Sequence, residues 1–137
     1  NFKNFDKFVL FIFRKFKKNI VISSGNLKIK ELDLIVEKHF SKSNNGIYIS
    51  KKYKNNLIFV NNTKFQDIEN LVKDSSYLSC CEGAISHVSN VFAKKTFAII
   101  NKRNIRTAKF WTDHMKNIRL IYRSNINEIC KNILKGI

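Results

Sequence analysis

The sequence predicts an α/β protein with a Rossmann-like, doubly wound parallel sheet of about five strands in three αβα layers. Short apolar segments alternate with longer segments of helical period along the 137 residues. Strands that are joined by helices of this length lie parallel, with right-handed crossovers. Small and polar residues follow the predicted strands, as they do where ligands bind at the carboxyl edge of an open sheet.

The first part of the chain predicts two helices, one strand and a polar connection. In residues 5–16 apolar side chains recur at the spacing of one helix face, and helical period returns over residues 28–40. Between them, residues 19–23 are β-branched and apolar, which is typical of a strand buried on both faces. The polar stretch 41–56 is interpreted as a loop, with or without a short strand at residues 47–49.

The same alternation continues to the C-terminal end. The predicted strands are residues 57–60, 77–80, 96–100 and 118–122. Each is followed by a segment of helical period, at residues 65–74, 84–93, 107–116 and 125–135. Because this architecture normally opens with a strand, whereas the chain opens with a predicted helix, we expect that an earlier strand is missing.

Length and composition predict a single domain in a reducing compartment. A chain of 137 residues can bury its own core. The longest apolar run, residues 8–13, is about a third of the ~20 residues that a membrane-spanning helix needs, and no signal-peptide cleavage site is recognisable. The chain has three cysteines, Cys80, Cys81 and Cys130, which is an odd number, and their spacing is not that of a metal site. We therefore expect neither a disulfide framework nor a metal site, and we expect a cytoplasmic location.

The formal net charge of +16 has two explanations. A basic protein attracts anionic partners such as nucleic acid or an anionic membrane surface. Codon bias is the alternative, because Lys, Asn, Ile and Phe all have A/T-rich codons and proline is absent. The lysines are spread along the chain, and no helix-turn-helix, zinc-finger or RNP-like element is present, so a nucleic-acid-binding module is the weaker interpretation.

Four loops are expected at the carboxyl edge of the sheet, where helix N-termini direct free N–H groups toward a ligand. Their small and hydrogen-bonding residues suit a polar ligand, although turns are polar for conformational reasons as well. The four loops are residues 23–25, 61–63, 81–83 and 101–103.

The third loop is the most informative. Glu82 supplies a carboxylate, Gly83 lets the backbone approach a ligand closely, and the helix that begins near Ala84 offers an anion site. His87 follows about one turn later. This arrangement could hold a sugar nucleotide, with backbone N–H groups on the diphosphate and Glu82 and His87 on hydroxyl or phosphate oxygens. The alternative is a favourable first-turn charge and a surface histidine.

Residues 79–92 and 95–100 resemble the bacterial heptosyltransferase family and its relatives among the inverting GT-B glycosyltransferases. The resemblance lies in an acidic residue, two small residues and a histidine, followed by a helix of small residues and an apolar strand. It covers about two thirds of the chain at the level of element order, and only the acidic-to-histidine motif is specific. It implies that the chain is the C-terminal donor-binding domain, half of a GT-B fold.

The resemblance also implies roles for individual residues. Glu82 occupies the acidic position, Gly83 and Ala84 the small positions, and His87 the histidine position of a cluster that contacts the donor diphosphate and sugar. Ala84 stands where glycine is commoner, which changes how closely the backbone approaches phosphate. Residues implied to lie near the base and ribose are Ser24, Gly25, Asn61, Asn62 and Thr63.

The family's catalytic base and acceptor site belong largely to an N-terminal domain for which this chain has no room. The resemblance therefore implies a nucleotide sugar as ligand, no metal or other cofactor, unknown catalytic residues, and an inactive fragment unless a longer chain supplies the missing acceptor domain. It places the function in bacterial cell-envelope polysaccharide or lipopolysaccharide synthesis, with peripheral contact to the anionic inner membrane.

Other features support weaker interpretations. A candidate anion patch consists of Lys102, Arg103 and Arg106, for which a solvated charged face is the alternative. Cys81 as a thiol nucleophile is disfavoured, because the neighbouring Glu82 carboxylate raises a thiol pKa. A noncatalytic interaction module is a further alternative, which would dimerise through the sheet edge left unpaired by the missing strand.

Overall fold

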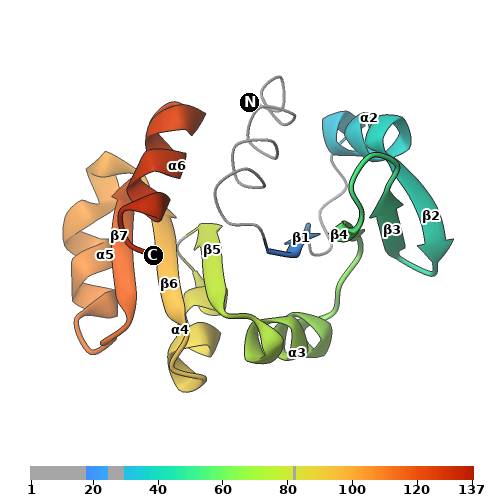
Figure 1. The fold of residues 1–137 in the computed structure, drawn as a ribbon. Coiled ribbons are helices and arrows are strands. Elements are labelled where there is room, and N and C mark those ends of the chain that lie inside the picture. The colour runs from blue at the N-terminus through green and yellow to red at the C-terminus, as the bar shows by residue number, and fades with distance from the viewer. Residues whose placement is uncertain (1–17, 25–29, 82) are drawn as a thin grey trace. The chain divides into compact units, whose positions relative to one another are not determined.

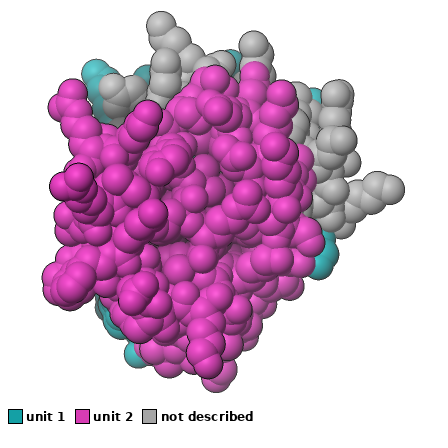
Figure 2. Space-filling model, turned by 90° about the vertical axis from the view of Figure 1, so that its left-hand side faces the viewer, with its two compact units in different colours: residues 1–68 teal, residues 69–137 magenta. Residues whose placement is uncertain are grey.

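The computed structural model describes residues 18–24, 30–81 and 83–137 (Figure 1). The predicted helix at residues 5–16, Gly25 and Glu82 lie outside the described residues. The chain divides into two compact units, Asn1–Ile68 and Glu69–Ile137, which Figure 2 colours separately. The prediction of one Rossmann-like domain that belongs to a longer glycosyltransferase stays a prediction.

Unit 1 is built on a mixed four-stranded sheet in the order β1-β4-β3-β2. Strands β1 and β4 run parallel, whereas β3 pairs antiparallel with both β4 and β2. Helix α2 spans Lys30–His39. The strands are β1 Ile20–Ser23, β2 Phe40–Asn44, β3 Ile47–Ser50 and β4 Lys54–Val60.

The hairpin β2–β3 corrects the prediction of a loop over residues 41–56 and confirms the short strand at residues 47–49. Its two-residue turn ends at Gly46, which has a φ of 73°. A Cβ at Gly46 would lie 2.9 Å from the backbone oxygen of Asn61, so glycine is required both for conformation and for space. Strand β2 has one buried residue, Phe40, and four exposed ones. As an edge strand it therefore lacks the apolar alternation from which strands are predicted.

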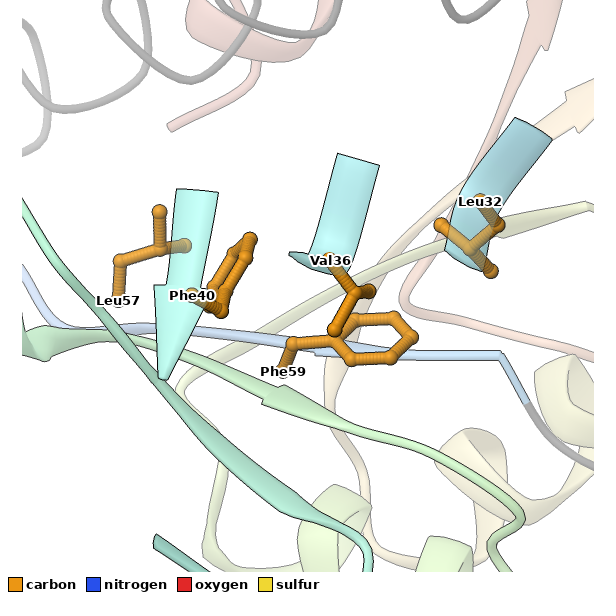
Figure 3. Packing of buried hydrophobic residues seen from close by; sticks show 5 residues of the cluster. All are labelled: Leu32, Val36, Phe40, Leu57 and Phe59. Carbon is orange, nitrogen blue, oxygen red and sulfur yellow. The ribbon is translucent and has the colours of Figure 1, made fainter. Parts of the chain in front are cut away.

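The core of unit 1 lies between α2 and the sheet (Figure 3). Leu32 and Val36 are four residues apart on α2 and therefore share one helix face. The Phe59 ring packs between aromatic rings from β2 and β3, with centroid distances of 5.9 Å to Phe40 and 6.0 Å to Tyr48. Aromatic burial of this kind dominates the stability of a small core.

Unit 2 is built on a parallel three-stranded sheet in the order β5-β6-β7. The register pairs Cys81 with Ile99 and Ile100 with Tyr122. The strands are β5 Tyr77–Cys81, β6 Lys95–Ile100 and β7 Ile118–Tyr122. The helices are α4 Ala84–Val91, α5 Ile105–Thr112 and α6 Ile126–Leu134, with a 3₁₀ turn η2 at Lys102–Asn104 before α5. Helix α3, Phe65–Asp74, spans the boundary between the units.

The α/β class is confirmed, but the prediction of one parallel sheet of about five strands is wrong. Strand β1 pairs parallel with β4 in one sheet, and β6 pairs parallel with both β5 and β7 in the other. The antiparallel hairpin β2–β3 extends the first sheet at β4, so that sheet is mixed. The other predicted helices and strands that fall on described residues are present, with boundaries shifted by a few residues. None of the described helices has both the length and the apolar composition that a bilayer crossing requires.

Candidate functional site

The candidate site is the carboxyl edge of the parallel sheet in unit 2. Because β5, β6 and β7 run in the same direction, their last residues, Cys81, Ile100 and Tyr122, share this edge. Helix α4 begins shortly after β5, η2 and α5 follow β6, and α6 follows β7. Each of these helical segments therefore directs its first N–H groups toward this edge.

Two of the three N-termini are capped by side chains. The Asn125 side chain accepts a hydrogen bond from the Glu128 N–H of α6, with an N···O distance of 3.0 Å. The Asn101 side chain accepts one from the Arg103 N–H of η2, at 3.1 Å. Asparagine at this position satisfies one of the free N–H groups of a helix start. These two starts therefore have part of their N–H capacity already occupied.

The start of α4 differs from these two; α5 proper, which continues from η2, also has no side-chain cap at Asn104. It begins after Gly83, no side chain of a described residue caps it, and its first turn holds no acidic residue. Gly83 has φ 154° and ψ −166°, a conformation that other residues rarely adopt, and a Cβ there would meet no described heavy atom within 4 Å. Glycine is thus required by the backbone and not by packing. As far as the described residues show, the α4 N-terminus is thus open to an anion, which the helix dipole favours.

Buried Ser86 holds this start in place. Its hydroxyl donates to the Gly83 carbonyl oxygen over 2.6 Å, and the Ser86 N–H donates to the same oxygen over 3.0 Å. Ser89, one turn further along α4, donates to the Ser86 carbonyl and shares a hydrogen bond with Thr96 on β6. The chain of hydroxyl contacts ties α4 to the central strand, so the position of the Gly83 backbone is set by the sheet.

Arg123 is a site residue that the sequence reasoning missed. Its N–H donates to the Ile100 carbonyl over 2.7 Å, which extends the pairing of β7 with β6. Its guanidinium Nη2 lies 3.7 Å from the Cys81 Sγ on β5. Since β5 and β7 flank β6, the side chain must cross the carboxyl end of β6, about 10 Å. It thereby brings a positive charge to the strand end that precedes Gly83. Its position directly after a predicted strand was the feature of the sequence that could have identified it.

His87 is exposed, and its ring stacks on that of another histidine. The His87 and His114 rings stack with centroids 5.9 Å apart and an interplanar angle of 30°. His114 follows the C-terminal end of α5, and α5 runs from the carboxyl edge of the sheet toward the opposite edge. This contact therefore directs the His87 ring along α4, away from Gly83. Ala84, the first residue of α4, is exposed at the edge.

The candidate anion patch lies at the same carboxyl edge. Lys102 and Arg103 belong to η2, Arg106 to the first turn of α5, and all three side chains are exposed. Together with Arg123 they give the described part of this edge a strongly basic character. Among the described helix starts at this edge, the acidic first-turn residue is Glu128 on α6. Long-range attraction of anions follows from such an unbalanced charge distribution.

The predicted loops of unit 1 also converge, at the carboxyl edge of β1 and β4. The Ser24 hydroxyl donates to the Asn61 side-chain oxygen over 2.8 Å, and the Ser23 and Thr63 hydroxyls lie 2.8 Å apart. Asn62 has a φ of 55°, and its N–H donates to the Asn61 side chain. Thr63 is 4% exposed, so its hydroxyl connects the two loops rather than facing solvent.

The cysteines differ in exposure and therefore in reactivity. Cys81 is exposed. Burial, and secondarily the neighbouring Cys81, raises the pKa of Cys80 to about 12, and burial raises the pKa of Cys130 to about 11. The thiolate is the reactive form, so these two thiols should be inert near neutral pH.

We therefore expect one fast-reacting thiol per folded chain when a disulfide reagent is added at pH 8. Cys81→Ser should remove the fast phase, and all remaining thiols should react after unfolding in guanidinium. The absorbance of the released thiol provides the measurement. A fast phase that persists in Cys81→Ser would show that the burial described for Cys80 or Cys130 is wrong.

Comparison with protein-family models, with curated proteins and with solved structures finds no match. Within the described residues, no group of three or more His, Cys, Asp or Glu side chains is arranged to hold a metal ion. The site combines a helix start that no described side chain caps with a guanidinium group at the end of the preceding strand, at the basic edge of a parallel sheet.

Proposed function

We propose that the carboxyl edge of β5, β6 and β7 binds the diphosphate of a nucleotide sugar. The observation that carries this proposal is the Arg123 guanidinium, which reaches Cys81 at the end of β5, next to the uncapped start of α4 at Gly83. Backbone N–H groups at a helix start bind phosphate oxygens, and a guanidinium binds two of them at once. A diphosphate is large enough to contact both the helix start and the guanidinium group.

The site residues have complementary roles in this proposal. Gly83 lets the backbone approach the phosphate, and Arg123 neutralises its charge. Lys102, Arg103 and Arg106 draw the anionic donor toward the edge. Contacts of Glu82 and Ala84 with the diphosphate and sugar are proposed from the heptosyltransferase resemblance, as are contacts of Ser24, Gly25, Asn61 and Asn62 with base and ribose. The resemblance also implies His87 and Thr63, but the His87 ring stacks on His114 and the buried Thr63 hydroxyl pairs with Ser23, so the geometry does not support these two contacts.

In this proposal the chain is the donor-binding part of a glycosyltransferase of cell-envelope polysaccharide or lipopolysaccharide synthesis. The reaction class follows from the resemblance, and the donor-binding role has independent support in the site geometry. The catalytic base and the acceptor site are expected on a further domain. Binding of the donor is accordingly the activity to measure on this chain.

Ligand-induced stabilisation tests the proposal. ADP, UDP, GDP and their sugar conjugates are compared with the corresponding nucleosides, which lack phosphate. A matching diphosphate should stabilise the fold by about 2.7 kcal/mol at a hundred times its Kd, whereas its nucleoside should leave the melting temperature nearly unchanged. If none of the diphosphate compounds raises the melting temperature, the proposal fails.

A further inference from the structure

Helix α5 exposes two adjacent aromatic side chains. Phe110 is 75% exposed and Trp111 is 55% exposed. Their rings meet edge to face, with centroids 5.6 Å apart and an interplanar angle of 80°. Single exposed apolar residues are common on proteins, but a paired aromatic surface indicates an interaction site. The diphosphate proposal makes no use of either residue.

The helix geometry shows that this pair is not part of the core. Ala108 is fully buried and Thr112 is 6% exposed, so these residues define the inner face of α5. Phe110 is two residues from each of them, about 200° around the helix axis. It therefore points away from the sheet. Figure 2 views unit 2 from the side that α5 occupies in Figure 1.

A third exposed apolar residue, Val91, lies on α4, the helix that packs on the same face of the sheet as α5. Right-handed crossovers from β5 to β6 and from β6 to β7 put α4 and α5 on one face of the sheet. The Asn117 side-chain amide donates to the Ala93 carbonyl over 3.1 Å, which links the segments that follow the two helices. Val91, at the end of α4, is 79% exposed. Val91, Phe110 and Trp111 thus all lie in the second half of their helices, away from the carboxyl edge.

The charges around the aromatic pair are mostly positive. Lys109 lies beside Phe110 on α5, and Lys116 follows the helix; both are exposed. The acidic residue of this segment is Asp113. We call Lys109, Phe110, Trp111 and Lys116 the aromatic face of α5.

We propose that the aromatic face of α5 docks on an anionic lipid bilayer. Tryptophan and phenylalanine partition into the interface between headgroups and acyl chains, where a short helix can lie flat. Exposed lysines beside them attract anionic headgroups. Protein interfaces are enriched in the same aromatic residues but depleted in lysine, so it is Lys109 and Lys116 that favour lipid over a protein partner.

This proposal does not depend on the diphosphate site. The aromatic face lies in the second half of α5 and beyond it, whereas the proposed anion-binding residues lie at the start of α5 and on the carboxyl edge. The two surfaces use different residues. Loss of one activity should leave the other intact, so the two proposals can fail separately.

Trp111 is the single tryptophan of the chain, so its fluorescence reports directly on this face. Vesicles of phosphatidylcholine and phosphatidylglycerol in equal amounts should shift its emission to shorter wavelength, and added salt should reverse the shift. Vesicles of phosphatidylcholine alone should cause little shift. In cosedimentation with the mixed vesicles, Lys109→Gln and Lys116→Gln should each weaken binding about fivefold.

Phe110→Ser should also weaken vesicle binding, and the matched control is Phe65→Ser. Phe65 is 59% exposed on α3 and lies outside the aromatic face. Circular dichroism confirms that each variant is folded. The proposal is overturned if the Trp111 emission is unchanged by mixed vesicles, or if Phe110→Ser and Phe65→Ser sediment alike. A concentration-dependent shift without lipid would also overturn it, because a second protein molecule would then cover this face.

Discussion

Replacing Phe97 with alanine is expected to lower the free energy of unfolding by about 3–5 kcal/mol. Phe97 lies on β6, the central strand of the parallel sheet, and is 1% exposed. Its ring lies so close to the C-terminal segment that a Cβ on Gly136 would be 2.5 Å from the Phe97 Cε1. Removal of the ring would leave a cavity that neighbouring strands on both sides cannot fill without distorting their pairing.

Urea unfolding followed by circular dichroism measures this loss. The matched control is Phe110→Ala, because Phe110 is 75% exposed and its truncation should change the stability by about 0.5 kcal/mol or less. Phe97→Leu retains most of the volume and should cost less than about 1.5 kcal/mol. It provides a folded variant if Phe97→Ala does not fold. Equal stabilities for Phe97→Leu, Phe110→Ala and the native chain would contradict the packing of β6.

Replacing Arg123 with glutamine is expected to reduce the affinity for a nucleoside diphosphate roughly 10- to 100-fold. The change removes the positive charge that lies beside Cys81 at the end of β5, while the side chain stays polar and long. The backbone N–H that pairs with Ile100 is unaffected by the substitution. A loss of affinity without a loss of stability would therefore assign the effect to the guanidinium.

Arg119→Gln is the matched control for this experiment. Arg119 is exposed on β7, the strand that precedes Arg123; it lies four residues earlier and hence about 13 Å from the carboxyl edge. Titration calorimetry with the diphosphate that stabilises the native chain gives the affinities of both variants. Unchanged affinity in Arg123→Gln, or an equal loss in both variants, would remove Arg123 from the site.

The candidate site illustrates how far sequence reasoning reaches. Gly83 was predicted from its place between a strand and a helix, because such junctions need a residue that allows close backbone approach. Arg123 was not predicted, since its role depends on crossing one strand to reach another. The contact between His87 and His114 depends in the same way on the packing of two neighbouring helices. Local sequence patterns contain no information about which residues from different strands or helices lie in contact.

The α/β class and most element positions follow from the sequence alone, because apolar period and β-branched composition act over a few residues. The division into a mixed and a parallel sheet was decided only by the tertiary structure. Strand β2 is polar because it lies at a sheet edge, and its pairing depends on the turn at Gly46 and on the β3–β4 contact. Partner choice among strands is a long-range property, whereas helix and strand periodicity is local.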